Sequence, residues 1–425
     1  MPDTIKRVSA SEILDSRGNP TIEVTVELQG GLGAKASVPS GASTGSAEAL
    51  ELRDNDPHRY GGKGVLKACQ NVDTEINRAL VGIRVTEQRQ IDDLMRELDN
   101  TPNKSRLGAN AILGVSLACA RAASKSLAVP LYQYLGDLYG NKKFTLPLPL
   151  VNVINGGLHA DTNLNIQEFW IIPVQQVSFS DRLRCADEIF MKLGSILKQA
   201  GRDTDVGNEG GYSPNFDSHQ QAFDYLRQAA SEAGYQLGRD CYLGMDAGAS
   251  VFFNSAKSTY NLQLENSEYT HDEWLDYLMN LLRTYPMLAV EDPLAEEDWT
   301  AWQVLTKQVK KEFPQLQLIG DDIFTTNVTR LQKGIDLGVA NAILIKPNQI
   351  GSLSETLDCI KLAKRHGYQT AISHRSGETI DSFIADLSVA VASEFIKTGS
   401  VARGERSAKY NRLLAIEKEL YGQQG

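Results

Sequence analysis

Short apolar runs in the second part of the chain end repeatedly in a charged or polar residue. The last residues of these runs are 23 to 45 positions apart, which leaves room for one helix and two turns in each interval. One such helix is recognisable, because Thr270 and Glu273 form a capping-box pattern ahead of a leucine-rich face. Strand–helix repetition on this scale is typical of a (β/α)8 barrel. The runs span residues 243–246, 288–291, 318–322, 342–346, 370–374 and 395–397.

A doubly wound open sheet is the alternative for such repetition. In that fold a G-x-G-x-x-G motif commonly follows the first strand, and this sequence has none. The pattern therefore favours the barrel.

The first part of the chain has a different organisation. Residues 21–28 alternate polar and apolar side chains, as in a half-buried antiparallel strand, and residues 34–38 are a plausible partner. Helical patterns follow at 65–80, 86–98 and 109–125. Strands followed by helices indicate an α+β unit.

The chain length and this change of pattern predict two domains. The 425 residues exceed the ~250–300 that one hydrophobic core normally serves. We expect an N-terminal α+β capping domain over residues 1–138 and a C-terminal barrel, which carries the active site, over residues 139–425.

Charge and cysteine content narrow the function classes. Lys and Arg number 43 against 53 Asp and Glu, a formal net charge of -10 that repels a nucleic-acid backbone. The five cysteines are scattered with no C-x-x-C pair, which argues against a disulfide framework or a thiolate zinc site and indicates a reducing, cytoplasmic location. No 18-residue apolar run and no export signal is present, so we expect no membrane as a partner. The negative net charge likewise leads us to expect no nucleic acid as a partner.

The polar residues at the predicted strand ends form an ordered series. In a barrel the carboxyl ends of the strands meet on one face, where catalytic groups gather. Asp246, Glu291 and Asp321 end three successive strands, and three neighbouring carboxylates repel one another unless a cation lies between them. Oxygen ligands without His or Cys select Mg²⁺ over zinc. The sequence therefore predicts a magnesium site.

The next strand ends carry basic residues, among them Lys346 and Lys397. Partial burial beside a cation would lower the pKa of Lys346 and make it a general base. A metal ion with a lysine suits removal of a proton next to a carboxylate, because the ion stabilises the enolate that forms; this pairing is a known example of pKa tuning in enzymes.

Several longer motifs resemble those of the enolases, the lyases that interconvert 2-phosphoglycerate and phosphoenolpyruvate. The likeness runs nearly from end to end and implies a barrel of the enolase type with an N-terminal capping domain. The motifs are LDSRGNPT at 14–21, VPSGASTG at 38–45, LGANAIL at 107–113, NGG at 155–157 with His159, QEF at 167–169, Lys346 with NQIG at 348–351, SHRSGE at 373–378 and IKTG at 396–399.

The resemblance implies a role for each matching metal ligand and catalytic group. Asp246, Glu291 and Asp321 match the ligands of a first Mg²⁺, which also binds the substrate carboxylate. Ser43 matches a ligand of a second Mg²⁺ that arrives with substrate. Lys346 matches the base that removes the C2 proton.

The remaining implied roles concern the leaving group and substrate binding. Glu209 matches the acid that protonates the C3 hydroxyl, Glu168 assists it, and Lys397 faces the charge that develops on the carboxylate. Arg375 and Ser376 match the phosphate clamp, in which a guanidinium donates two parallel hydrogen bonds. The other substrate contacts implied are His159 on a mobile lid loop, Gln167, Ser373 and His374, together with Glu168, Glu291, Asp321 and Lys397. The implied assembly is a homodimer or a larger homo-oligomer.

Two departures from the family pattern lie near the implied site. Asn208 stands where the family usually has an aspartate beside the acid; losing that like charge predicts a more acidic Glu209 and slower turnover. Gly248 and Val251 depart in a lid loop after the first metal ligand, which predicts incomplete closure and a raised KM.

Two further departures are expected to matter less. Pro347 favours an extended conformation in Lys346, which suits a strand end, so we expect no effect. Ala415 stands where many enolases have an arginine that pairs across the dimer with the counterpart of Glu23, so one dimer contact is weakened.

Two other hypotheses stay open beside a working enolase. The departures at Asn208 and Val251 allow an enolase-fold paralogue of weak or altered activity. A binding or scaffold protein that uses the fold as a surface is the other, although such a protein has no need of mutually repelling carboxylates.

Overall fold

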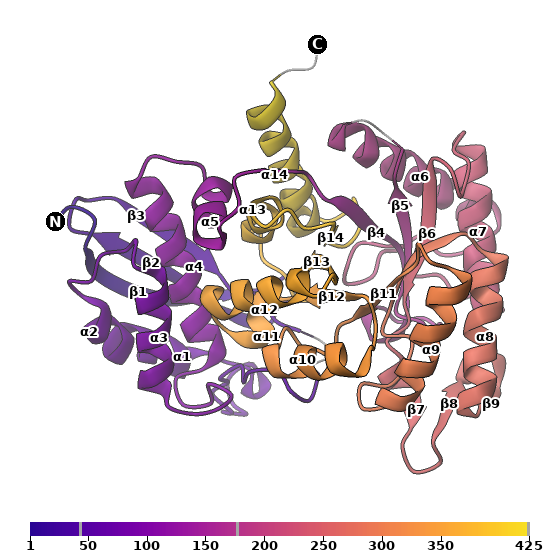
Figure 1. The fold of residues 1–425 in the computed structure, drawn as a ribbon, viewed down its shortest axis with the longest axis horizontal. Helices are drawn as coiled ribbons and strands as arrows, with labels where there is room; N and C mark the ends of the chain where they lie inside the picture. The colour runs from indigo at the N-terminus through magenta and orange to yellow at the C-terminus, as the bar shows by residue number, and fades with distance from the viewer. Residues whose placement is uncertain (42–44, 176–177, 423–425) are drawn as a thin grey trace.

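The computed structural model describes residues 1–41, 45–175 and 178–422, and it has two parts that lie side by side (Figure 1). The N-terminal part contains the antiparallel sheet β1 (Ile5–Leu14), β2 (Pro20–Leu28) and β3 (Gly33–Ser37), in that spatial order. Its helices are α1 (Leu66–Asn71), α2 (Asn77–Leu80), α3 (Gln88–Asp99), α4 (Ala109–Ser126) and α5 (Leu131–Tyr139). The strands and helices predicted for this part are therefore confirmed, with β1 added at the beginning.

Helix α4 covers one face of this sheet. The alternate residues Ile22, Val24 and Val26 of β2 are fully buried, which explains the alternation in the sequence. Small residues along α4 allow close contact: a Cβ atom on Gly114 would lie 2.6 Å from the Val24 side chain. The α+β prediction is therefore confirmed: a strand that is buried at every second residue packs against an alanine-rich helix.

The C-terminal part is a closed eight-stranded barrel, so the open-sheet alternative is wrong. Its spatial order is β4, β5, β6, β10, β11, β12, β13, β14, closing back on β4. All six predicted apolar runs are barrel strands. The strands are β4 (Leu148–Asn155), β5 (Glu168–Pro173), β6 (Cys241–Asp246), β10 (Met287–Glu291), β11 (Gln317–Gly320), β12 (Ala342–Ile345), β13 (Gln369–Ser373) and β14 (Phe395–Lys397).

Strand β5 runs antiparallel to both of its neighbours, unlike a uniform strand–helix repeat. The cause is the connection from β4, which is only the segment 156–167 with a single 3-10 turn, so the chain reverses as in a hairpin. This register sets Glu168 directly beside Asp246. The two strands within residues 148–173 were not predicted from periodicity, because every residue in them except the half-buried Leu148 is buried and no alternation results.

Helices surround the barrel, and apolar side chains fill its interior. Trp170 is the largest interior side chain and packs with Leu150, Ile319 and Leu344. The capping box predicted at Thr270 and Glu273 is present at the start of α8. The outer helices are α6 (Phe179–Gln199), α7 (His219–Glu232), α8 (His271–Thr284), α9 (Trp299–Glu312), α10 (Val328–Leu337), α12 (Leu353–Arg365), α13 (Phe383–Ala390) and α14 (Gly404–Tyr421), with the short α11 (Pro347–Ile350) before α12.

A small sheet projects from the barrel beside α8 (Figure 1). It consists of β7 (Phe253–Asn254), β8 (Thr259–Leu262) and β9 (Ser267–Tyr269), and it follows the segment that contains Val251. The Val251 side chain is 46% exposed.

The two parts meet close to the carboxyl ends of the barrel strands. The backbones of Ser40 and Gly377 exchange hydrogen bonds of 2.8 and 2.9 Å. Arg121 of α4 forms an ion pair of 2.6 Å with Asp381 of the barrel part. The domain boundary at residues 138/139 stays a prediction, with α5 ending at Tyr139 and β4 beginning at Leu148.

No single helix in the described residues has the length and apolar character needed to cross a membrane. Helices α4 and α5 meet that criterion only as a pair, and they are bent by 109° relative to each other.

Candidate functional site

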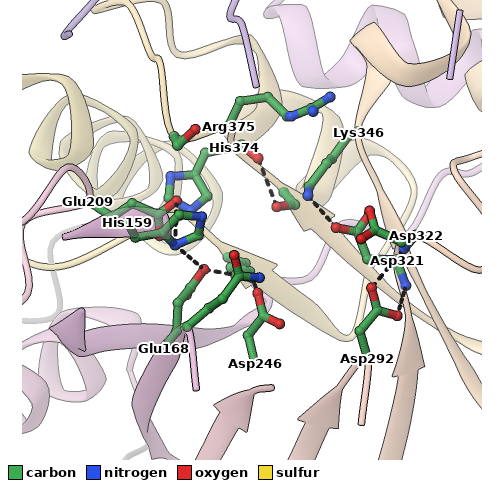
Figure 2. Close-up of a pocket in the computed structure, with 14 residues that line it drawn as sticks. His159, Glu168, Glu209, Asp246, Asp292, Asp321, Asp322, Lys346, His374 and Arg375 are labelled. Atoms are coloured by element: carbon green, nitrogen blue, oxygen red, sulfur yellow. Dashed lines mark hydrogen bonds and ion pairs between the residues drawn. The ribbon is translucent and has the colours of Figure 1, made fainter. Parts of the chain in front are cut away.

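A cavity of about 380 Å³ lies at the carboxyl ends of the barrel strands (Figure 2). Twelve of the fourteen residues predicted for the site line it. Of the other two, Glu291 forms an ion pair of 2.7 Å with the lining residue Lys397, and Ser43 falls outside the described residues. The predicted lining residues are His159, Gln167, Glu168, Glu209, Asp246, Asp321, Lys346, Ser373, His374, Arg375, Ser376 and Lys397.

Three carboxylates lie side by side on adjacent strands and share one ammonium group. Glu168 pairs in register with Asp246, and Asp246 with Glu291. Lys397 Nζ lies 3.0, 3.1 and 2.7 Å from carboxylate oxygens of Glu168, Asp246 and Glu291. Burial by itself would lower the pKa of Lys397, but these carboxylates outweigh it and raise that pKa well above its usual range. Lys397 is therefore a fixed cation.

Lys346 binds Asp321, the carboxylate at the end of β11. Burial would lower the pKa of Lys346, but the charge of Asp321 outweighs it and raises that pKa. This differs from our expectation of a lowered value, because Lys346 has an anionic partner in this structure. A cation bound to Asp321 would reverse the balance.

The carboxylates at the ends of β6, β10 and β11 fit a hard divalent cation. Burial, with the charges of Asp246 and Asp321 added, raises the pKa of Glu291 well above its usual range. Oδ1 of Asp246 is buried and has no hydrogen-bond partner among the described residues. A divalent cation would both satisfy this oxygen and relieve the repulsion.

Among the described residues, two clusters of ligand-type side chains in this cavity have donor atoms within 4.8 Å of one another, and the predicted trio Asp246, Glu291 and Asp321 is not one of them. One is His159, Glu168 and Glu209; the other is Asp292, Asp321 and Asp322. Asp292 has a structural role, since its carboxylate accepts hydrogen bonds from the backbone N–H groups of Asp321 and Asp322 at 2.9 and 2.8 Å. It fixes the turn that presents Asp321.

Glu168 and Glu209 form a buried pair on the side of the cavity opposite Lys346 (Figure 2). His159 Nδ1 lies between them, 3.4 Å from Glu168 Oε1 and 3.6 Å from Glu209 Oε1. Trp170 Nε1 donates to the other oxygen of Glu168 at 2.8 Å. Asn152 Nδ2 donates to Glu209 Oε2 at 3.1 Å. These donors hold the two carboxyl groups in fixed positions.

The surroundings of Glu209 favour its ionised form. Burial would raise the pKa of Glu209, but His159, His374 and Arg406 together lower it well below its usual range. The direction agrees with the acidic Glu209 expected from Asn208, but the cause in the structure is the surrounding basic side chains. Asn208 itself is held by its backbone, whose N–H donates to the carbonyl of His159 at 2.9 Å.

Arg375 is buried and faces the cavity near Lys346 (Figure 2). Its Nη1 and Nη2 atoms donate to Glu48 at 2.9 and 3.1 Å, and Nη1 also donates to Asn348 at 3.1 Å. Burial would lower the pKa of Arg375, but Glu48 and the nearby aspartates outweigh it and raise that pKa. Arg375 is therefore a permanent cation in the lining of the cavity.

The neighbouring Ser376 is connected to the N-terminal part through Arg17. The Arg17 guanidinium donates to Ser376 Oγ at 3.4 Å and to the carbonyls of Ser40 and Gly41 at 3.3 and 3.0 Å. Ser373 Oγ donates to the carbonyl of His374 at 2.9 Å. The phosphate-clamp residues predicted from the motif are thus gathered at the junction of the two parts.

The departures at Gly248 and Pro347 have local explanations. Gly248 has φ +55°, and a Cβ atom there would lie 2.1 Å from Gln167 Nε2. Lys346 is extended with φ -119° and ψ 105°, and Pro347 occupies the first position of α11, so the extended conformation expected before this proline is confirmed. Neither residue distorts the barrel strands next to it.

Sequence reasoning missed Glu48, Asp292 and Arg406, which hold predicted residues in place. Glu48 lies three residues after the 38–45 motif, and Asp292 directly follows Glu291, so proximity to a motif was an available signal. Arg406 had none, because it belongs to α14 and reaches the site only through the fold.

Family models match both parts of the chain. The model described as "Enolase, N-terminal domain" matches residues 5–135, and the model described as "Enolase, C-terminal TIM barrel domain" matches residues 143–424.

Proposed function

Since the chain belongs to the enolase family, we propose that it catalyses the reversible, Mg²⁺-dependent dehydration of 2-phosphoglycerate to phosphoenolpyruvate. The family assignment indicates a lyase-type enzyme. The observation that carries the specific reaction is the opposition of Lys346 to Glu168 and Glu209 across one buried cavity (Figure 2).

This opposition suits an elimination reaction. Lys346 would remove the proton from C2 at one side of the substrate, while Glu209 would protonate the C3 hydroxyl as it leaves on the other. The removal of a weakly acidic proton requires that negative charge on the substrate carboxylate be stabilised. Lys397, fully buried among carboxylates, supplies a positive charge that cannot rotate away.

The protonation states also follow from the charges around the site. The basic residues around Glu209 keep it ionised in this structure. A substrate that brings a phosphate and a carboxylate adds negative charge, which raises the pKa of Glu209 and favours the protonated acid that dehydration needs. Its low starting pKa suits the reverse direction, in which Glu209 accepts a proton.

The enolase family generally uses Mg²⁺, and we propose two ions per site. Asp246, Glu291 and Asp321 would hold the first, and Ser43 would help to hold a second that arrives with substrate. When bound, the metal would polarise the substrate carboxylate and stabilise the enolate. The unpartnered Asp246 Oδ1 and the raised pKa of Glu291 support the first site.

Arg375 and Ser376 would bind the phosphate, with His159, Gln167, Ser373 and His374 as further contacts. Arg375 is suited to this because a guanidinium matches the geometry of a phosphate through parallel hydrogen bonds.

The direct test is conversion of 2-phosphoglycerate to phosphoenolpyruvate, followed by the absorbance of the enol product. We expect activity that requires Mg²⁺ and disappears with EDTA. Lys346→Ala should abolish it while the protein still binds Mg²⁺. As a matched control, Lys307→Ala changes a lysine on α9, a helix of the barrel exterior, and should leave the activity unchanged.

Absence of turnover in a folded wild-type protein that binds Mg²⁺ would overturn this proposal. The paralogue of weak or altered activity, suggested by Asn208 and Val251, would then be the better description. Stoichiometric capture of a protein partner together with negligible turnover would favour the scaffold hypothesis.

We further propose a cytoplasmic homo-oligomer, at least a dimer. The sheet that would take part carries Glu23 on its central strand β2, and Glu23 binds Lys35 within the same chain at 2.8 Å. Sedimentation equilibrium tests this assembly directly.

A further inference from the structure

Arg406, on helix α14, has a side chain that is completely buried beside the predicted acid and phosphate-clamp residues. Its Nη1 atom lies 2.6 Å from Nδ1 of His374 and 2.6 Å from the carbonyl oxygen of Arg375. Its Nη2 atom donates to the carbonyls of Asn208 and Ser376 at 2.9 and 2.6 Å. One guanidinium group therefore contacts both the segment that carries Glu209 and the segment that carries the clamp.

The contact between Arg406 and His374 determines where the imidazole proton lies. A guanidinium group has only N–H donors, remains protonated in proteins and cannot accept a hydrogen bond. Nδ1 of His374 must therefore be the acceptor. A neutral histidine with an accepting Nδ1 carries its proton on Nε2.

That Nε2 atom faces Glu209, at 3.5 Å from Oε2, and it has no hydrogen-bond partner among the described residues. The packing around the imidazole is consistent with a ring held in this orientation. Gly399 has φ +82°, and a Cβ atom there would lie 2.8 Å from Cδ of Arg406 and 3.1 Å from Cε1 of His374. A glycine at this position allows the ring and the guanidinium stem to approach each other closely.

We propose that Arg406 is a positioning residue that fixes the Nε2–H tautomer of His374, so that a neutral imidazole presents its N–H to the carboxylate of Glu209. The relevance of this tautomer to catalysis rests on the function proposed above. The tautomer itself follows from the donor chemistry of Arg406. Burial of His374, together with the neighbouring guanidinium charge, lowers the pKa of the ring and supports the neutral form.

A fixed neutral donor has a specific consequence for the acid. An N–H group that faces Glu209 from a neutral ring is not itself a competing acid, so a proton delivered by Glu209 comes from its own carboxyl group. An Nδ1–H tautomer would instead turn a lone pair towards the carboxylate and weaken this arrangement.

The test is a two-bond ¹H–¹⁵N correlation of the histidine rings in the ¹⁵N-labelled full-length protein. The chain contains six histidines, and His374 is assigned by its loss in a His374→Gln variant. We expect an unprotonated Nδ1 and a protonated Nε2 in the wild type across neutral pH. In Arg406→Met, which keeps the stem and removes every donor, we expect mixed tautomers or a protonated ring.

Arg412→Met is the matched control. Arg412 lies on the same helix but binds Asp386 and Glu419, so its loss should leave the His374 signals in place. Arg406→Lys keeps a charged donor and provides a second variant if Arg406→Met does not fold. We expect it to retain the wild-type tautomer while kcat falls by about tenfold or more with a smaller change in KM, because charged hydrogen bonds to the carbonyls are lost.

A protonated Nδ1 in the wild type, or unchanged His374 signals in folded Arg406→Met, would overturn the proposal. These readouts need no turnover. A protein with the expected tautomer but no conversion of 2-phosphoglycerate would overturn the proposed function and leave the role of Arg406 standing.

Discussion

The guanidinium group of Arg375 and the carboxylate of Glu48 form a bidentate ion pair across the junction of the two parts of the chain, with N···O distances of 2.9 and 3.1 Å. Glu48 is itself held by two other donors, the backbone N–H of Gly45 at 3.0 Å and the side-chain amide of Gln349 at 3.3 Å. Because these donors anchor the carboxylate independently, the pair orients the arginine.

Replacing Glu48 tests this orientation. In Glu48→Gln we expect the KM for 2-phosphoglycerate and the Kd for inorganic phosphate to rise by about tenfold, the equivalent of one charged hydrogen bond. Asp321 and Asp322 also act on the charge of Arg375, and they would draw the guanidinium once Glu48 is neutral. Enzyme kinetics and calorimetric titration with phosphate give the two values.

Glu51→Gln is the matched control, since Glu51 lies in the same segment but its partners are Arg53 at 2.6 Å and the Ser40 hydroxyl at 2.9 Å. It should leave both values unchanged. Tighter phosphate binding in Glu48→Gln would mean that Glu48 competes with phosphate, and the orienting role would be wrong.

Restoring the usual family residue beside the acid tests the departure at Asn208. In Asn208→Asp we expect kcat to rise by a few-fold up to about tenfold, the effect of one pKa unit. The added negative charge raises the pKa of Glu209 and increases the fraction of protonated acid. Steady-state kinetics in the dehydration direction measure kcat, and an unchanged or lower value in Asn208→Asp would refute the argument.

Gly248 makes room for Gln167, so an added methyl group should disturb the cavity. In Gly248→Ala the Cβ atom would lie 2.1 Å from Gln167 Nε2, and the residue would keep a left-handed backbone at a cost of about 1–2 kcal/mol. We expect a lower melting temperature and a raised KM. Gly338→Ala is the control, because Gly338 has φ +69° with no atom within 4 Å of the added carbon.

The two variants separate backbone strain from contact with Gln167. Both should lose thermal stability, but only Gly248→Ala should change KM. An equal KM in the two variants would show that Gln167 does not contribute to substrate binding.

Acid sensitivity is expected at the contact between Glu265 and His219. His219 Nδ1 lies 2.8 Å from Glu265 Oε1, and His219 Nε2 accepts the N–H of Asn165 at 3.0 Å. Burial would raise the pKa of Glu265, but His219 outweighs it and lowers that pKa. The stabilisation is therefore complete above the ordinary pKa of 4.5 and is lost as the pH falls through the lowered value.

In Glu265→Gln we expect a loss of about 1–2 kcal/mol near neutral pH. The difference in melting temperature from the wild type should shrink as the pH falls below 4.5 and through the lowered pKa of Glu265. A difference that stays constant over this range would show that the charge of Glu265 contributes nothing to the contact.

The sequence determined the barrel and most of the candidate site. An apolar run that ends in Asp246, Lys346 or Lys397 is a local feature of the sequence. When such runs repeat along the chain, few folds other than a barrel accommodate them. The motifs then identified the side chains individually. The described structure brings together all of the predicted site residues that it includes, with Glu291 in an ion pair with the lining residue Lys397.

The tertiary structure alone decided the direction of β5 and the partners of the charged groups. Glu48 lies 327 positions from Arg375, and Arg406 lies 198 positions from Asn208, so no local pattern could relate them. The raised pKa of Lys346, opposite to our expectation, has the same origin. Hydrophobic periodicity depends on near neighbours in the chain, whereas the charge state of a buried group depends on which distant groups share its low-dielectric surroundings.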